Sequence, residues 1–123
     1  MNDVTKTVDT YFEMWNETDP ARRADHIERA WVRDCHYVDP QLEADGPAAI
    51  NAMVAAVQAR FPHHRFRRVS GIDNHHTELR FAWELAAPDG SIVVAGIDVA
   101  GLAPDGRLQR VTGFFGELPA RAA

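Results

Sequence analysis

The sequence predicts an α+β fold in which three N-terminal helices pack on one face of a curved, mainly antiparallel sheet. Apolar residues recur at helical spacing from the N-terminus to Phe61, and Pro62 ends that pattern. After Pro62, apolar and polar residues alternate, as in strands with one buried face. Pro-Asp-Gly turns at 88–90 and 104–106 divide this region into a meander of long strands. Helices followed by strands are typical of an α+β domain.

Three segments have the features of amphipathic helices. The first covers about residues 3–17. The second begins at Asp19-Pro20, because aspartate caps a helix and proline fits its first turn, and it continues through Trp31. The third begins at Gly46-Pro47 and ends before Pro62. The three apolar stripes are Val4, Val8, Tyr11, Phe12 and Trp15, then Ile27, Ala30 and Trp31, then Ile50, Met53, Val54, Val57 and Phe61.

Strand signals account for the remaining segments. "CHYVDP" predicts a short first strand that Pro40 stops, and "RFRRVSGIDNHH" is strand-like with a bulge expected at Gly71. Ser91 to Leu102 and "RLQRVTGFFGE" predict the last two strands. Between these regions the odd-numbered residues form an apolar face, which we expect to face the core: Thr77, Leu79, Phe81, Trp83 and Leu85.

Composition limits the classes of function. The 123 residues predict a single domain over 1–123, and a net charge of −5 argues against nucleic acid as a partner. Cys35 is the only cysteine, which excludes an intramolecular disulfide or a multi-cysteine metal site. Charged residues at the N-terminus argue against a signal peptide, and no apolar run reaches the length of a membrane span. We therefore expect a cytoplasmic protein that does not bind membranes.

Asp98 is a single carboxylate in the apolar run "SIVVAGIDVAGL", and its role depends on the register of one hairpin. If Ala87 pairs with Ser91, Asp98 falls opposite Arg80 and forms a solvated ion pair of little energetic value. A loop one residue longer sets Asp98 against Phe81 on the core face. Burial would then raise the pKa of Asp98, and a neutral carboxylic acid can donate a hydrogen bond to an oxyanion. We favour the inward register, because the odd-numbered face of the neighbouring strand is the core face.

Two further polar residues lie in apolar settings. Tyr11 lies on the buried stripe of the first helix, where a tyrosine is often a core residue with a locally satisfied hydroxyl. Asp39 ends the first strand before a proline, where an aspartate often caps a turn. Together with Asp98 they could form a base and an oxyanion hole, which suits proton abstraction next to a carbonyl.

No cofactor or metal is expected. A glycine-rich phosphate loop, a dinucleotide fingerprint and a nucleophile elbow are all missing from the sequence. The adjacent pairs His63-His64 and His75-His76 lack the converging arrangement of a metal site, since neighbours in a strand point to opposite faces. One inward histidine, His75 or His76, could bind substrate or act as an acid or base, and the alternative is a surface or turn histidine.

Three segments resemble the nuclear transport factor 2-like superfamily, and within it the SnoaL-like proteins and ketosteroid isomerases. "YFEMWNETD" is similar to the first helix of the isomerases, "YVDP" to the segment carrying their base, and "IDVAGLAPDGRLQRVTGFFGE" to the segment that starts at their oxyanion-hole aspartate. The resemblance implies a cone-shaped α+β barrel, with Tyr11 and Asp98 as oxyanion donors and Asp39 as proton shuttle. The pocket wall implied for a substrate comprises Trp15, Phe61, Phe81, Trp83, Leu85, Val94, Val111 and Phe115, to which His75 and His76 are added as candidates.

The expected function is cofactor-independent chemistry on a small hydrophobic carbonyl compound. An isomerase, a cyclase or a dehydratase working through an enol or enolate fits these residues. Known SnoaL-like polyketide cyclases use a single strand aspartate as acid and base. Asp98 is therefore a candidate catalytic residue for either a cyclase or an isomerase, while Asp39 and Tyr11 are specific to the isomerase. The alternative is a non-catalytic module that binds a small molecule or dimerises. The resemblance also implies a homodimer formed through the outer face of the sheet.

Overall fold

The computed structural model describes residues 4–122, and their order of helices and strands follows the prediction closely. The helices are α1 (Val4–Asn16), α2 (Pro20–Ala30) and α3 (Pro47–Arg60). The strands are β1 (Trp31–Val38), β2 (Glu43–Asp45), β3 (Arg65–Arg68), β4 (Asp73–His75), β5 (Glu78–Ala86), β6 (Ile92–Leu102) and β7 (Leu108–Phe115). Among them, the three-residue strand β2 was not predicted. None of the helices in residues 4–122 is long and apolar enough to cross a membrane.

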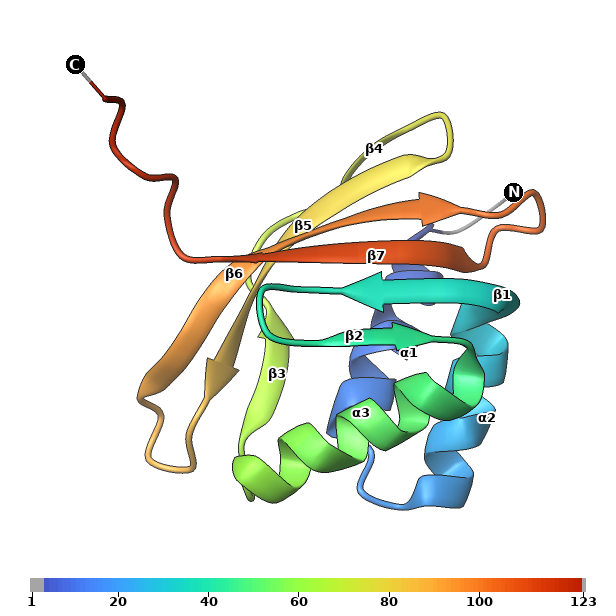
Figure 1. Ribbon diagram of the computed structural model, residues 1–123, viewed down its shortest axis with the longest axis horizontal. Helices are drawn as coiled ribbons and strands as arrows, with labels where there is room; N and C mark the ends of the chain where they lie inside the picture. The colour runs from blue at the N-terminus through green and yellow to red at the C-terminus, as the bar shows by residue number, and fades with distance from the viewer. Residues whose placement is uncertain (1–3, 123) are drawn as a thin grey trace.

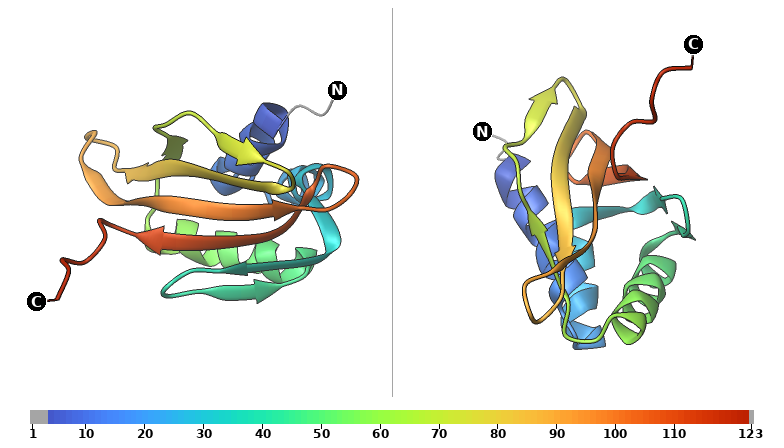
Figure 2. Two further views of the ribbon diagram at one scale, coloured as in Figure 1. Left: turned by 90° about the horizontal axis from the view of Figure 1, so that it is seen from above. Right: turned by 90° about the vertical axis from the view of Figure 1, so that its left-hand side faces the viewer.

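The strands of residues 4–122 form one curved, unclosed sheet with the order β2-β1-β7-β6-β5-β3, and β4 pairs with β5. Neighbouring strands are antiparallel except β1 and β7, which are parallel. All three helices lie on the same side of the sheet (Figures 1 and 2). The predicted α+β class, with helices against one face of a mainly antiparallel sheet, is confirmed.

Helix α2 begins as predicted but ends one residue earlier. The Asp19 carboxylate accepts a hydrogen bond of 2.9 Å from the backbone N–H of Arg22, and Pro20 occupies the first turn. Trp31 has extended backbone angles, φ −122° and ψ 148°, and is the first residue of β1. The prediction that Trp31 continues the helix is therefore wrong. Its side chain is buried in the core, as the helical spacing also predicted, so the apolar spacing alone did not reveal the change to a strand.

A buried arginine ties the three helices together. Arg23 is only 1% exposed. Its guanidinium donates to the Glu17 carbonyl at 2.9 Å, to Asn51 Oδ1 at 2.8 Å and to Gln58 Oε1 at 2.8 Å. The Gln58 amide in turn donates to the Trp15 carbonyl at 2.9 Å. These bonds hold α3 against α1 and α2 and so fix the position of its C-terminal turn.

The register of the β5–β6 hairpin turns Asp98 toward the core as predicted, but a β-bulge produces it and not a longer loop. The Ala87 N–H donates to the Ser91 carbonyl at 2.8 Å, which is the short loop that by itself would set Asp98 opposite Arg80. Val93 is then an extra residue: Ala86 pairs with Ile92, whereas Leu85 pairs with Val94. This β-bulge shifts the rest of the strand by one residue, and Asp98 pairs with Phe81. The predicted outcome is confirmed, and the longer loop predicted to cause it is wrong.

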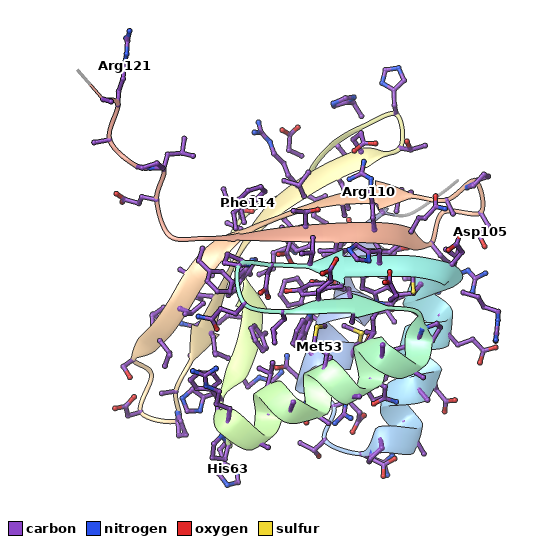
Figure 3. All side chains as sticks on the ribbon, viewed as in Figure 1. Met53, His63, Asp105, Arg110, Phe114 and Arg121 are labelled. Atoms are coloured by element: carbon purple, nitrogen blue, oxygen red, sulfur yellow. The ribbon has the colours of Figure 1, made fainter. Side chains whose placement is uncertain are left out.

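The β6–β7 hairpin repeats this construction. Its Pro-Asp-Gly turn is closed by a bond of 2.8 Å from the Ala103 N–H to the Arg107 carbonyl, and Gly106 has a φ of 88°. Leu102 pairs with Leu108, but Gly101 pairs with Arg110, so that Gln109 is the extra residue. The shift places Gly113 directly opposite Asp98. Figure 3 shows Arg110 and Phe114 of the same strand on the outer side of the sheet, away from the helices.

The segment after Pro62 forms two short strands. β3 and β4 both pair with β5, and residues 69–72 between them belong to no strand. Residues 69–72 lie opposite only residues 81–82 of β5, and the Val69 N–H still donates to the Ala82 carbonyl at 3.0 Å, so that two extra residues interrupt the pairing around Gly71, where a bulge was predicted. The alternation predicted for the next strand is confirmed by four side chains that are at most 6% exposed: Leu79, Phe81, Trp83 and Leu85. Thr77 lies in the turn before β5 and is exposed.

Candidate active site

Asp98 lies on the inner face of β6, and both of its carboxyl oxygens accept hydrogen bonds. Tyr11 Oη donates to Oδ2 at 2.7 Å, and the indole Nε1–H of Trp83 donates to Oδ1 at 3.0 Å. The residue is 4% exposed. Burial raises its pKa to about 7, although the two hydrogen bonds act in the opposite direction, and the nearby Asp39 adds to the rise. Asp98 can therefore both hold and release a proton near neutral pH.

Tyr11 reaches Asp98 from the middle of α1. Its side chain is 1% exposed, and burial, followed by the charge of Asp98, raises its pKa well above the ordinary value for tyrosine. The Phe81 ring packs edge-on against it, with centroids 6.0 Å apart. Tyr11 is thus a neutral hydroxyl group in a fixed position, whose one hydrogen is donated to Asp98 and whose oxygen can still accept a hydrogen bond.

Asp39 follows β1 and has two kinds of partner. Its Oδ1 accepts hydrogen bonds from the backbone N–H groups of Gln41 and Leu42, both at 2.8 Å. Asp39 therefore caps the turn, which is one of the two roles named for it from the sequence. Its Oδ2 accepts a bond of 2.7 Å from the Tyr37 hydroxyl. Tyr37 is 3% exposed, and burial raises its pKa. The turn and Tyr37 together hold the Asp39 carboxyl group in one orientation.

Gly113 separates the two acidic side chains. A Cβ atom at this position would lie 3.0 Å from Asp98 Oδ1, 3.1 Å from Asp39 Cβ and 3.5 Å from Tyr37 Oη. Any side chain there would push apart the groups that meet around it. The absence of a side chain at Gly113 therefore allows Asp39, Tyr37 and Asp98 to gather at one place.

A cavity of about 240 Å³ opens beside this cluster. It is lined by Trp15, Tyr37, Asp39, Gln41, Leu42, Ala56, Val57, Arg60, Phe61, Phe66, Leu85, Val94 and Phe115. A small inner chamber shares three of these residues and adds Tyr11, Phe12, Trp83 and Asp98. Asp39 therefore lies in the wall of the main cavity, and the pair Tyr11–Asp98 lies in the adjoining inner chamber.

The predicted substrate-binding residues fall into three groups. Trp15, Phe61, Leu85, Val94 and Phe115 line the main cavity, and Trp83 lines the inner chamber. Phe81 and Val111 face the core but line neither space; they are 3% and 1% exposed and form the packing behind it.

The structure places neither His75 nor His76 at the cavity. His75 ends β4 and His76 begins the turn to β5 with a φ of 51°, and both side chains are exposed. The two rings contact each other outside the cavity, with 3.1 Å between their Nδ1 atoms. Their exposed positions, at the end of β4 and in the turn after it, match the surface or turn histidines named as the alternative. Within residues 4–122, no cluster of three or more histidine, cysteine or acidic side chains could hold a metal ion.

Several cavity residues were missed by sequence reasoning. Tyr37 is the most important of them, and its signal was present: it precedes Asp39 by two positions in a strand, so both side chains point to the same face. The others come from the loop after Asp39, from the last turns of α3 and from β3: Gln41, Leu42, Ala56, Val57, Arg60 and Phe66.

A curved sheet over three helices, with an acid and a tyrosine in a chamber beside an apolar cavity, defines the class of small cone-shaped α+β proteins. The chain is similar to a protein of the SnoaL-like family from Agrobacterium tumefaciens that is described as a candidate isomerase. The identity is 37%, the TM-score is 0.89, and the match covers 95% of this chain and 100% of that one. The protein belongs to the SnoaL-like family.

More distant structures share the fold. An NTF2-like protein of unknown function from Exiguobacterium has a TM-score of 0.72 and 21% identity, over 91% of this chain and 99% of that one. A candidate polyketide cyclase from Sinorhizobium meliloti has a TM-score of 0.69 and 16% identity, over 88% and 93% of the two chains. No family model and no curated protein matches the sequence.

Proposed function

We propose that the protein is a cofactor-independent enzyme that moves a proton next to the carbonyl group of a small hydrophobic compound. The observation that carries this proposal is that Asp39 and Asp98 meet around Gly113, with Tyr11 bound to Asp98, next to a largely apolar cavity. A carboxylate base and a hydroxyl donor beside a partly protonated acid are the groups that enolisation requires. The SnoaL-like relative described as a candidate isomerase supports the same class of reaction.

In the proposed reaction the substrate carbonyl points into the inner chamber and the adjacent carbon faces Asp39. The Asp39 carboxylate removes a proton from that carbon, and the C–H electron pair moves into a carbon–carbon double bond while the carbonyl oxygen becomes an enolate oxygen. Tyr11 stabilises the enolate oxygen by hydrogen bonding, and Asp98 supports Tyr11 through the bond between them. Asp39 then returns the proton to a different carbon, which completes an isomerisation without an added cofactor.

Two other functions use the same site differently. A polyketide cyclase would use Asp98 as its acid and base, with Asp39 only shaping the cavity, and the fold neighbour described as a candidate cyclase supports this alternative at the level of the fold. A binding module would use the cavity without chemistry.

Turnover of a β,γ-unsaturated ketone tests the proposal. A Δ5-3-ketosteroid is a suitable probe, because its conjugated product is followed by ultraviolet absorbance. We expect turnover by the purified protein without added metal or cofactor, and loss of turnover in Asp98→Asn. Saturable binding with no conversion of this probe or of smaller cyclic ketones would favour a binding module, and ring closure of a polyketide-like β-keto ester would favour a cyclase.

The charge pattern of the cavity suggests a further property of the ligand. Arg60, in the last turn of α3, is the only cation among the lining residues, and its guanidinium lies 5.5 Å from the centre of the Phe61 ring. Within residues 4–122 it forms no ion pair, not even with Asp39 in the same cavity. An anionic substituent on the substrate would supply the missing partner.

We expect a carboxylated ligand to bind more tightly than its neutral analogue, by roughly fivefold because the arginine is exposed. Arg60→Gln should remove this difference, and Arg33→Gln, which changes an exposed arginine outside the cavity, should keep it. Equal affinities of the two ligands for the wild-type protein, measured by calorimetry, would exclude the anionic substituent.

A homodimer formed through the outer face of the sheet remains part of the proposal. Ile97 and Phe114 pair across β6 and β7 on that face, and they are 44% and 56% exposed. Large apolar side chains grouped on an exposed sheet face are typical of protein interfaces. The mass of the protein in solution, measured by sedimentation, tests this part.

A further inference from the structure

Trp83 has a polar contact that its position in the apolar wall does not require. Its indole Nε1–H points at Asp98 Oδ1 from the neighbouring strand, at 3.0 Å, and both residues are buried. The other oxygen of the same carboxyl group, Oδ2, is 2.7 Å from Tyr11 Oη. The two oxygens of Asp98 therefore have chemically different neighbours, and this difference decides where a proton can sit.

An indole nitrogen donates a hydrogen bond and cannot accept one. A proton on Oδ1 would make that oxygen a weaker acceptor for the indole, and its hydrogen would have no acceptor among the hydrogen-bond partners of Asp98, Trp83 and Tyr11, whose hydroxyl lies at the other oxygen. A hydroxyl group, by contrast, both donates and accepts. On Oδ2 the proton can be donated to Tyr11 Oη, while Trp83 keeps its bond to Oδ1.

We infer that Trp83 is a positioning residue that confines the proton of neutral Asp98 to Oδ2, facing Tyr11. When Asp98 is ionised, Tyr11 donates to it. When Asp98 is protonated, Tyr11 accepts from Oδ2, and the hydrogen of its own hydroxyl group is released toward the chamber. Asp98 thus acts on a substrate oxygen through Tyr11, and the direction of the Tyr11 hydroxyl follows the protonation of Asp98.

Within residues 4–122, few other titratable groups lie near Asp98. Tyr11 from α1, and Tyr37 and Asp39 from β1 and the turn after it, are the titratable groups near Asp98. From the two strands beside β6, the residues that meet the Asp98 carboxyl group are Trp83 and Gly113, which do not titrate. The midpoint near pH 7 therefore reports mainly on Asp98 and its bonds.

Nuclear magnetic resonance of the tryptophan indoles tests the inference without any substrate. The chain has three tryptophans, so that three indole N–H signals are expected. We expect the Trp83 signal to shift with a midpoint near the Asp98 pKa of about 7 and this shift to vanish in Asp98→Asn. The Trp31 signal is the internal control, because its indole donates to Met14 Sδ instead, and it should not follow Asp98.

A pair of matched variants supplies the second readout. Trp83→Phe keeps an aromatic ring but removes the donor to the carboxylate form, so the Asp98 pKa, followed by ¹³C carboxyl signals, should rise by about one unit. Trp31→Phe makes the same change elsewhere in the core and should leave that pKa unchanged. An Asp98 pKa that stays constant or falls in Trp83→Phe, or a Trp83 indole that ignores pH, would overturn the inference. If Trp83→Phe does not fold, the wild-type indole titration decides alone.

The consequence for catalysis rests on the proposed function and is tested separately. In an active enzyme, the pH midpoint of kcat should move upward with the Asp98 pKa in Trp83→Phe while KM changes little, whereas a merely structural role would leave the pH midpoint in place. A protein that shows the indole titration but no turnover would refute the proposed function and leave the role of Trp83 intact.

Discussion

Asp39→Asn is expected to lower turnover of a β,γ-unsaturated ketone by roughly 10²- to 10⁴-fold, the range typical of losing a general base. An amide cannot take up the proton that leaves the substrate carbon. The oxygen of the new amide can still accept the backbone N–H groups of Gln41 and Leu42, which the Asp39 carboxylate accepts at 2.8 Å. The turn should therefore persist, and affinity for a ketone ligand should stay close to that of the wild-type protein.

Asp105→Asn is the matched control. Asp105 also caps a turn, by accepting the backbone N–H of Arg107 at 3.0 Å, but it lies outside the cavity. Steady-state kinetics of this variant should match the wild type. Normal turnover in Asp39→Asn would remove Asp39 as the base, and it would favour the cyclase reading in which Asp98 alone exchanges the proton.

The second large expected effect is a decrease, as pH rises, in the contribution of Asp98 to the free energy of unfolding. In the unfolded chain an aspartate loses its proton near pH 4, whereas burial keeps Asp98 protonated up to about pH 7 in the folded protein. Between these values the folded state binds more protons than the unfolded state, so the contribution of Asp98 to the free energy of unfolding falls as pH rises. A difference of about three pH units corresponds to about 4 kcal/mol, lost between pH 4 and pH 7 and constant above it.

Asp98→Asn should remove this dependence, because an amide does not titrate. The asparagine can accept from Trp83 and donate to Tyr11, so the variant should equal the wild type near pH 4 and exceed its stability by about 4 kcal/mol at pH 8. Urea unfolding of both proteins at several pH values isolates Asp98, since all other titrating groups are common to both. A stability difference that does not change with pH would contradict a buried, late-ionising Asp98. Higher stability with lost activity is the trade-off expected of a catalytic group held in an unfavourable environment.

The helices and the inward direction of Asp98 could be predicted from sequence because each depends on a repeating pattern. Apolar spacing marks one face of α1 and α3, and the alternation of Leu79, Phe81, Trp83 and Leu85 marks the core face of β5. These patterns sum over many residues, so an error at one position does not change the outcome. The position of Tyr11 in the site follows from the same reasoning.

What could not be predicted depends on single contacts between distant segments. The register of β6 depends on one extra residue, Val93, which no local composition marks as a bulge. The buried guanidinium of Arg23 needs three acceptors, one from the turn after α1 and two from α3, and a sequence shows none of them as neighbours. Gly113 meets Asp98 only because a second bulge, at Gln109, adjusts the register of β7. Trp83 could be placed in the wall, but its bond to Asp98 depends on the register of β6 against β5.

The bulge at Val93 also affects how relatives of this protein are compared. A gain or loss of one residue in a hairpin loop is usually treated as neutral in an alignment, because loops tolerate length changes. Here the inserted residue lies inside the strand, and it decides which side of the sheet every later residue of β6 occupies. A relative that lacks it could retain the aspartate at the aligned position and still present it to solvent. Presence of the acid in an alignment is therefore insufficient to transfer the activity, and the number of residues between the turn and the acid must be compared as well.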